Sequence, residues 1–206
     1  MGQLSAGIAH ELNNPLGVVI MYANILLEEQ AQNSEMKEDL ELIVKQAERC
    51  KNIVGDLLNF ARKNQVKYQD VNLVELLKSS LESVIIPENI KTSVESNVTD
   101  PIAKIDEEQM MQVITNLNKN AVEAMQNGGE LMLSLSETQK DFILKVKDSG
   151  TGIPKENMDK LFTPFYTTKG IGKGTGLGLA TTYGVVKMHK GKIDVESNDK
   201  PELGPT

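Results

Sequence analysis

The stretch DEEQMMQVITNLNKNAVEAMQ, residues 106–126, decides the fold of the larger part of this chain. Its acidic start suits the positive end of a helix dipole, and its side chains repeat with the period of an α-helix. Asn116, Asn120 and Glu123 share one face of that helix. Apolar side chains share another face: Ile114, Leu117, Ala121 and Ala124. We therefore expect one long helix that packs on a core with its apolar face and presents a polar stripe on the other.

Segments with strand character lie on both sides of this helix. They are residues 90–98, 101–105, 128–138, 141–150 and 191–197. Two more helices are expected at 70–84 and 175–189, the second of them starting on glycines. Strands mixed with helices in this way predict an α/β two-layer sandwich.

The first 66 residues have a different pattern, with almost no strand character. Apolar side chains recur at alternating spacings of four and three, as on one face of a helix. The first such row is Ile8, Leu12, Pro15, Val19, Tyr22 and Leu26, and the second is Leu40, Ile43, Ala47, Cys50, Val54, Leu57 and Ala61. A hairpin of two helices has too little core to bury both rows, so we expect two copies to form a homodimeric four-helix bundle.

The polar segment 62–70 is interpreted as a linker. It divides the chain into an all-α helical hairpin at 1–66 and an α/β domain at 67–206.

Composition excludes several classes of function. The chain has 206 residues, a net charge of −7 and 4% aromatic residues without tryptophan, which disfavours nucleic-acid binding. No apolar run approaches the roughly 20 residues that span a bilayer, so no membrane contact is expected. Cys50 is the single cysteine, which excludes an internal disulfide framework and fits the reducing cytoplasm.

Two glycine-rich stretches carry candidate binding chemistry. In GKGTGLGLA, residues 172–180, Gly174, Gly176 and Gly178 run into a helix, so backbone amides and the helix dipole can meet a phosphate. In DSGTGIP, residues 148–154, the Asp148 carboxylate can accept a hydrogen bond from an exocyclic amine such as that of adenine. The alternative explanation for GKGTGLGLA is a flexible loop, and the alternative for DSGTGIP is an ordinary Asp/Gly turn. The long loop between the two stretches is expected to be a lid or binding loop.

The polar stripe on the long helix is a plausible set of oxygen ligands for Mg²⁺, although a solvated helix face is the commoner explanation.

A further cluster lies in AHELNNPL, residues 9–16, where His10 is expected to face solvent beside Glu11. Such an imidazole is suited to nucleophilic attack, with the carboxylate accepting its proton. Asn14 lies about one turn further along the same face, where its amide can orient a water molecule. The alternative for Asn14 is that it only relieves the backbone near Pro15.

Taken together, these motifs resemble the catalytic core of bacterial two-component sensor histidine kinases over nearly the whole chain. AHELNNPL resembles the phosphoacceptor box, NLNKNAVEAM (116–125) the asparagine box, and DSGTGIP and GTGLGLA the two glycine boxes. LFTPFYTTK (161–169) resembles the phenylalanine box of the lid. In style the motifs look closest to the nitrogen-regulation-like kinases. The implied fold is a dimerisation and phosphotransfer hairpin followed by an ATP-binding domain of the GHKL superfamily.

The resemblance also implies roles for particular residues. His10 would be phosphorylated from ATP, Glu11 would be the general base, and the phosphoryl group would pass to an aspartate of a response-regulator receiver domain. Asn14 would serve a phosphatase activity on that regulator. Asn120, assisted by Asn116, would hold Mg²⁺. The ATP-binding residues would be Asn116, Asn120, Asp148, Gly150, Gly152, Lys169, Gly174, Thr175, Gly176, Leu177 and Gly178.

Asn118 departs from the family pattern, which usually has an apolar residue there. The chain also ends, at ELGPT, where such domains normally continue into another core strand, and it starts without a sensor segment. We therefore interpret it as a cytoplasmic fragment of a protein that can be membrane-anchored. Another GHKL-type ATPase and an inactive signalling scaffold remain as alternatives.

Overall fold

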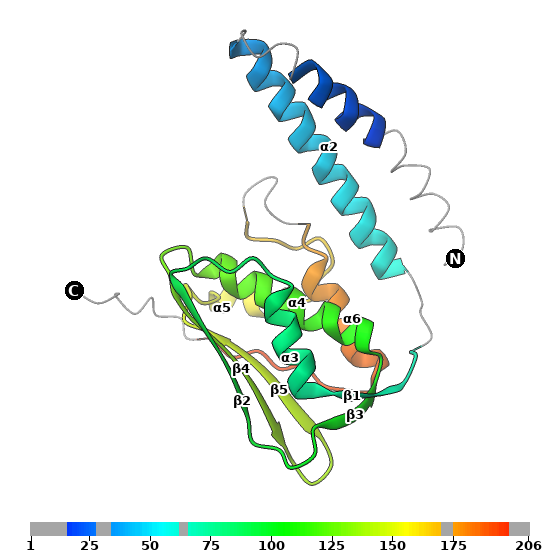
Figure 1. The fold of residues 1–206 in the computed structure, drawn as a ribbon, viewed down its shortest axis with the longest axis vertical. Coiled ribbons are helices and arrows are strands. Elements are labelled where there is room, and N and C mark those ends of the chain that lie inside the picture. The colour runs from blue at the N-terminus through cyan, green and yellow to red at the C-terminus, as the bar shows by residue number, and fades with distance from the viewer. Residues whose placement is uncertain (1–15, 28–33, 62–65, 170–174, 198–206) are drawn as a thin grey trace, which may run out of the picture. The chain divides into compact units, whose positions relative to one another are not determined.

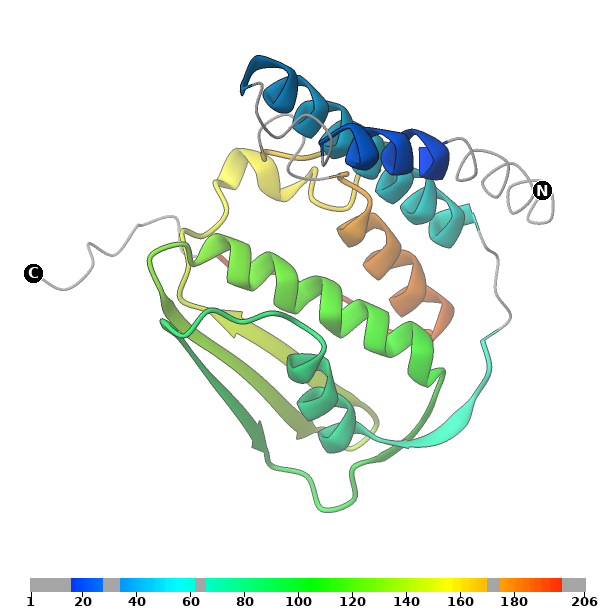
Figure 2. The ribbon, with the colours of Figure 1, turned by 45° about the horizontal axis from the view of Figure 1, so that its top comes forward.

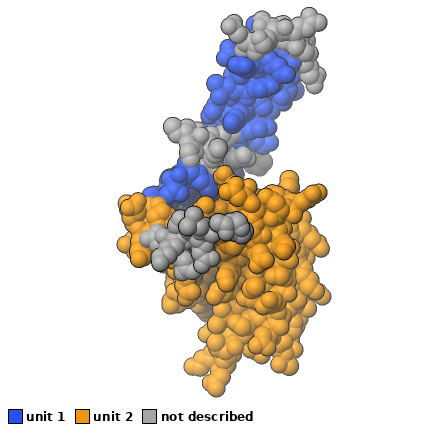
Figure 3. Space-filling view, turned by 90° about the vertical axis from the view of Figure 1, so that its left-hand side faces the viewer, with its two compact units in different colours: residues 1–64, 163–180 blue, residues 65–162, 181–206 orange. Residues whose placement is uncertain are grey.

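The computed structural model describes residues 16–27, 34–61, 66–169 and 175–197. The chain divides into two compact units, residues 1–64 with 163–180 and residues 65–162 with 181–206 (Figure 3). The lid and second glycine stretch therefore group with the helical hairpin. The domain boundary predicted after residue 66 stays a prediction.

Two helices form the hairpin of the first unit: residues 16–27 and α2 (Ser34–Ala61) (Figure 1). Ala23, Leu40 and Ala47 are buried, so one side of the pair is closed. Tyr22 and Ile43, which belong to the predicted apolar rows, remain 59% and 46% exposed. The single hairpin thus buries only part of the apolar rows, as expected of two helices without a partner.

Two sheets form the second unit. β1 (Gln69–Asn72) pairs antiparallel with β3 (Ile102–Ile105). The larger sheet has the order β2 (Ile90–Ser96), β4 (Gly129–Glu137), β5 (Phe142–Asp148), parallel in its first pair and antiparallel in its second. Leu131, Leu133 and Leu135 on the central strand β4 are at most 1% exposed, because alternate side chains of a strand point to the same face.

Helices α3 (Leu73–Glu82) and α4 (Glu107–Ala124) cover one face of this sheet (Figure 2). Leu77 of α3 and Ile114 of α4 are at most 2% exposed and belong to the same core cluster as the leucines of β4. Val185 of α6 (Gly178–Met188) joins that cluster. This layering confirms the predicted α/β sandwich.

The structure differs locally from the predicted elements. The helix expected from residue 70 begins only at Leu73, because the Asn72 side chain caps it by accepting the backbone N–H groups of Val74 and Glu75. Residues 69–72 form β1 instead. The long loop contains the short helix α5 (Lys155–Met158).

The final segment, 191–197, is not a strand. Ile193 and Val195 are half-buried while their neighbours are exposed, as a strand pattern requires, but no ladder pairs the segment with another strand among the described residues. Alternation alone cannot make a strand without a hydrogen-bonding neighbour.

Asn118 lies fully buried on the inner side of α4. Its Nδ2 donates to Oγ of Ser80 on α3 at 3.1 Å, and that hydroxyl donates to the Leu77 carbonyl at 2.7 Å. The Oδ1 atom of Asn118 has no partner in the described structure. A buried acceptor without a partner is destabilising, so this position carries an energetic cost within the core.

We expect Asn118→Leu to raise the free energy of unfolding by about 1–2 kcal/mol, because it removes the unpaired acceptor and leaves Ser80 bonded to Leu77. Ser80→Ala should lower it by about 1–3 kcal/mol, because both polar ends of Asn118 are then unpaired. Urea unfolding measures both. Destabilisation by Asn118→Leu, with Ser80→Ala neutral, would contradict this description of the α3–α4 contact.

Candidate functional site

A tight turn follows β5 and begins at the exposed carboxylate of Asp148. Its Oδ1 accepts the backbone N–H of Gly150 at 2.9 Å, closing an Asx turn. The next N–H, that of Thr151, donates to the Ala124 carbonyl at the end of α4 at 3.2 Å. Asp148 is therefore held by backbone contacts at a defined place beside the last turn of α4.

Gly150 makes this close approach possible. A Cβ atom at this position would lie 2.7 Å from the Ala124 Cβ and 2.8 Å from the Asp148 Oδ1. Gly152, two residues on, has a φ of +71°, a conformation that glycine adopts without strain. The glycines of DSGTGIP therefore have a structural reason to be where they are: Gly150 allows the close contact with Ala124, and Gly152 allows the positive φ.

The polar stripe of α4 leads to the corner where this turn contacts Ala124. Asn116 and Asn120 are half-buried, whereas Glu123 is exposed. Ala124, which holds the turn, comes four residues after Asn120 and is its neighbour on the helix surface. The structure thus places the turn of Asp148, Gly150 and Gly152 against the last turn of α4, with Asn120 about one helical turn and Asn116 about two turns before Ala124.

The second glycine stretch lies in the other unit, next to the lid motif. The Phe165 N–H donates to the Gly176 carbonyl at 3.0 Å, and Gly176 has a φ of +69°. A Cβ on Gly176 would lie 2.4 Å from the Phe165 carbonyl carbon, so only glycine fits. Leu177 is fully buried, and α6 starts at Gly178. The buried side chain of Leu177 anchors this backbone, and the nucleotide-binding role predicted for Leu177 stays a prediction.

The remaining predicted residues are Thr175, which is half-buried, Lys169, which is exposed, and four that lie outside the described residues. Thr175 Oγ1 accepts the Leu177 N–H at 3.4 Å, and Lys169 is exposed with its N–H on Thr167. His10, Glu11, Asn14 and Gly174 fall outside the described residues, so their roles stay predictions.

The asparagine stripe of α4 offers amide oxygens as possible metal ligands. In the described part of the chain, no three His, Cys, Asp or Glu side chains converge on a point where an ion could sit. The oxygens of Asn116 and Asn120 are hard ligands, which suit Mg²⁺ shared with an anionic ligand. The donor set therefore fits the predicted ion.

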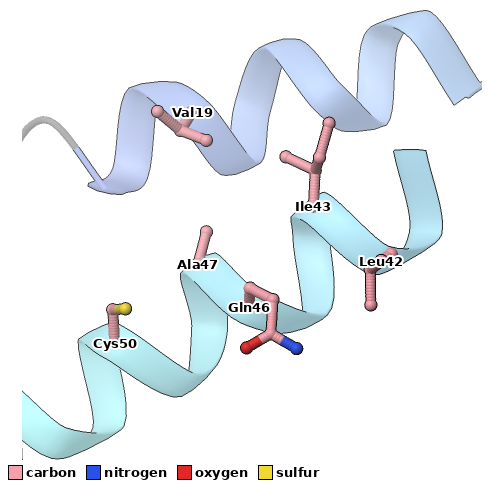
Figure 4. Close-up of a pocket in the computed structure, with 6 residues that line it drawn as sticks. All are labelled: Val19, Leu42, Ile43, Gln46, Ala47 and Cys50. Atoms are coloured by element: carbon pink, nitrogen blue, oxygen red, sulfur yellow. The ribbon is translucent and has the colours of Figure 1, made fainter. Parts of the chain in front are cut away.

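An apolar groove of about 380 Å³ opens along the hairpin (Figure 4). Ile43 and Ala47 point from α2 toward the helix that carries Val19. The lining is Val19, Leu42, Ile43, Gln46, Ala47 and Cys50.

In the regions that the structure describes, no helix has the length and apolar character needed to cross a membrane.

Sequence reasoning missed Asp106 and His189. Asp106 is buried and caps α4, and its backbone N–H donates to Nε2 of His189 at 3.0 Å. A histidine just after a helix in an acidic chain carries no signal that would reveal such a contact.

Comparisons with known proteins find histidine kinase families over both parts of the chain. Residues 1–66 match the family "His Kinase A (phospho-acceptor) domain", and residues 105–204 match "Histidine kinase-, DNA gyrase B-, and HSP90-like ATPase". The sensor histidine kinase ZraS of Escherichia coli K12 is 34% identical over 202 residues, covering 97% of this chain and 43% of ZraS. The chain thus spans less than half the length of this relative.

Solved structures agree as well. Histidine kinase ThkA in complex with response regulator protein TrrA is 27% identical with a TM-score of 0.58, covering 82% of this chain and 52% of that one. Full-length ShkA in complex with AMPPNP has a TM-score of 0.74 at 24% identity, covering 91% of this chain and 41% of that one, and so shares the fold.

Gly150→Ala should destabilise the second unit by about 1–3 kcal/mol, because a Cβ there must push the turn away from α4. Gly184→Ala is the matched control: a Cβ on that helical glycine meets nothing within 4 Å, so it should stabilise by about 0.5–1 kcal/mol. Thermal and urea unfolding of both variants decide the matter. Equal effects of the two substitutions would show that the contact with Ala124 is unimportant.

Proposed function

Because the chain belongs to the histidine kinases, with a phospho-acceptor domain ahead of an ATPase domain, we propose that it is an ATP-dependent protein-histidine kinase. It phosphorylates His10 and passes the phosphoryl group to an aspartate of a response regulator. The observation that carries the ATP-dependent half is the corner where the Asp148 turn contacts Ala124, in the last turn of α4. It combines a carboxylate for an amine and two glycines, and the asparagine stripe of α4 offers two amide oxygens.

In this proposal the corner binds the adenine base through Asp148 and the phosphates through Mg²⁺. Oδ1 of Asp148 is engaged by the Gly150 N–H, and its carboxylate accepts the adenine amine. Gly150 and Gly152 keep the wall beside the base flat. Asn120 and Asn116 hold Mg²⁺, which neutralises phosphate charge when bound. Lys169 and the backbone from Gly174 through Thr175, Gly176 and Leu177 to Gly178 bind the phosphates.

The chemical step belongs to the phosphoacceptor box. A ring nitrogen of His10 attacks the γ-phosphorus of ATP, the bond from phosphorus to the oxygen of ADP breaks, and Glu11 accepts the ring proton. The phosphoryl group then moves from His10 to an aspartate carboxylate of the receiver domain, which restores the imidazole. Asn14 orients the water molecule that hydrolyses this aspartyl phosphate, which is the phosphatase activity on the regulator.

The partner proposal is supported by the ThkA complex with response regulator TrrA. ATP and reduced thiols are properties of the cytoplasm, and one unpaired cysteine suits that compartment. We therefore place this part of the protein there.

The homodimer is the second partner proposal, and the hairpin supports it. Both helices of the hairpin carry exposed apolar residues, among them Tyr22, Leu26 and Ile43, and Ile43 lines the apolar groove. Such a surface in water favours burial against a second copy, which completes a four-helix bundle. The phospho-acceptor family match over the hairpin agrees with this arrangement.

His10→Gln should abolish acid-labile phosphoenzyme formation while a fluorescent ATP analogue still binds within about twofold of the parent, because His10 is not among the residues proposed to bind the nucleotide. Asn120→Asp should instead weaken binding of the nucleotide with Mg²⁺ or abolish turnover, because it alters the ligands proposed for Mg²⁺. Labelled ATP with Mg²⁺ and a nucleotide titration measure the two quantities. Acid-labile phosphate on His10→Gln would refute the nucleophile, and unchanged binding and rate in Asn120→Asp would refute the stripe.

Glu11→Ala and Asn14→Ala should separate the two activities. Glu11→Ala should cripple autophosphorylation, because the ring proton loses its acceptor. Asn14→Ala should slow dephosphorylation of a phosphorylated regulator by about tenfold or more, because the attacking water loses its orientation. The assay adds each variant to pre-phosphorylated regulator with and without ADP. If Asn14→Ala dephosphorylates as fast as the parent while Glu11→Ala does not, this division is wrong.

Ile43→Glu should weaken dimerisation by at least about a hundredfold, because a two-fold interface places the buried charge twice. Lys45→Glu, an exposed position on the same helix, is the control and should remain dimeric. Sedimentation velocity across a dilution series reports the state. A dimeric Ile43→Glu protein would place the interface elsewhere.

A further inference from the structure

His189 lies at the end of α6 and connects three separate parts of the second unit. Its Nδ1 lies 2.9 Å from the Val185 carbonyl oxygen, and its Nε2 lies 3.0 Å from the backbone nitrogen of Asp106. Its ring meets that of Tyr68 edge-on, at 5.9 Å between centroids and 72° between planes. The contacts come from α6, from the start of α4 and from the chain just before β1.

The hydrogen bonds define the state of the imidazole. A carbonyl oxygen only accepts, so Nδ1 carries the proton and donates it to Val185. The Asp106 backbone N–H only donates, so Nε2 must be the unprotonated acceptor. Both ring nitrogens are therefore engaged by groups whose roles are fixed.

Asp106 extends this contact to the arriving chain. Its side chain is 6% exposed and accepts two backbone N–H groups: Oδ1 takes that of Gln109 at 3.1 Å, and Oδ2 takes that of Lys67 at 2.9 Å. One residue thus caps α4, binds His189 through its own N–H and holds Lys67. We call Lys67, Tyr68, Asp106, Val185 and His189 the His189 junction.

A neighbouring contact supports the same attachment. Gln69 Nε2 donates to Glu107 Oε2 at 2.7 Å, and Gln69 pairs with Ile105 in the β1–β3 ladder. The chain that comes from the linker is therefore fastened to the first residues of α4 at successive positions. A displacement of this chain has to move α4 or break these bonds.

We propose that His189 is a positioning residue of the kinase: by accepting the Asp106 N–H it fixes the first turn of α4 against α6, and through Asp106 it joins both helices to the linker. This inference rests on the proposed function, because α4 carries Asn116 and Asn120 and α6 begins at the second glycine stretch. The linker then reaches the nucleotide-binding helices through the His189 junction.

His189→Phe keeps an aromatic ring beside Tyr68 but removes the acceptor, whereas His189→Gln can return an acceptor near the position of Nε2. Lys190→Ala, an exposed neighbour, is the control. Binding of trinitrophenyl-ATP with Mg²⁺ to the whole chain should weaken about tenfold in His189→Phe, the effect of one lost buried hydrogen bond. His189→Gln and Lys190→Ala should stay within about twofold of the parent.

Amide hydrogen exchange, measured without nucleotide, provides a second readout. In His189→Phe the backbone amides of Lys67 and Asp106 and the first turn of α4 should exchange at least about tenfold faster, while the leucines of β4 keep parental rates. His189→Gln should restore protection.

Unchanged exchange at Lys67 and α4 in His189→Phe would overturn the proposal, as would equal losses in the Phe and Gln variants. A uniform rise in exchange over the whole unit would mean that His189 serves only global stability. If the parent itself binds no nucleotide, the proposed function fails, and the exchange data still decide whether His189 positions α4.

Discussion

The carboxylate and backbone of Asp106 fix where α4 begins, and the second unit depends on that one start point. A helix whose N-terminal N–H groups lack acceptors frays or shifts, and each residue of shift rotates every side chain by about 100° around the axis. Here such a rotation would turn Ile114 out of the core and move Ala124 away from the Asp148 turn together. The apolar core and the candidate site are therefore positioned by the same constraint.

The two faces of α4 impose opposite demands at their border. The apolar face needs close packing against the leucines of β4, and the polar face needs room for a ligand. Ala124 satisfies both, because its small side chain lets Gly150 approach while its carbonyl receives the Thr151 N–H. Asn118 is a polar residue on the apolar face of α4, where it is buried with its Oδ1 atom unpaired. A hydrogen bond to Ser80 compensates for part of this burial.

Periodicity made much of this fold predictable from the sequence. The long helix around Asn120 and the strands 128–138 and 141–150 were evident because their apolar spacing matches helix and strand geometry. The strand at Gln69–Asn72 was not, because Asn72 belongs to a pattern that continues into α3. The segment 191–197 has the right alternation, yet a strand also needs a neighbour, which no local pattern supplies.

For the candidate site, the residue types in DSGTGIP and the asparagine stripe predicted the chemistry before any geometry was known. The contacts that hold these residues in place were invisible in the sequence. Asp106 and His189 are 83 positions apart, and nothing in either stretch points to the other. Sequence motifs thus indicated candidate ligand-binding groups, whereas contacts such as that of Asp106 with His189 are evident only in the structure.

The corner formed by α4 and the Asp148 turn is the proposed binding site for Mg²⁺ and ATP. Nuclear magnetic resonance of the asparagine side-chain amides tests it directly, with a non-hydrolysable ATP analogue and Mg²⁺ added to the chain. The account predicts that the amide resonances of Asn116 and Asn120 and the backbone resonance of Gly150 move at saturation, while the exposed, distant Asn97 stays in place. Saturable binding of the analogue that leaves Asn116, Asn120 and Gly150 unmoved would contradict it.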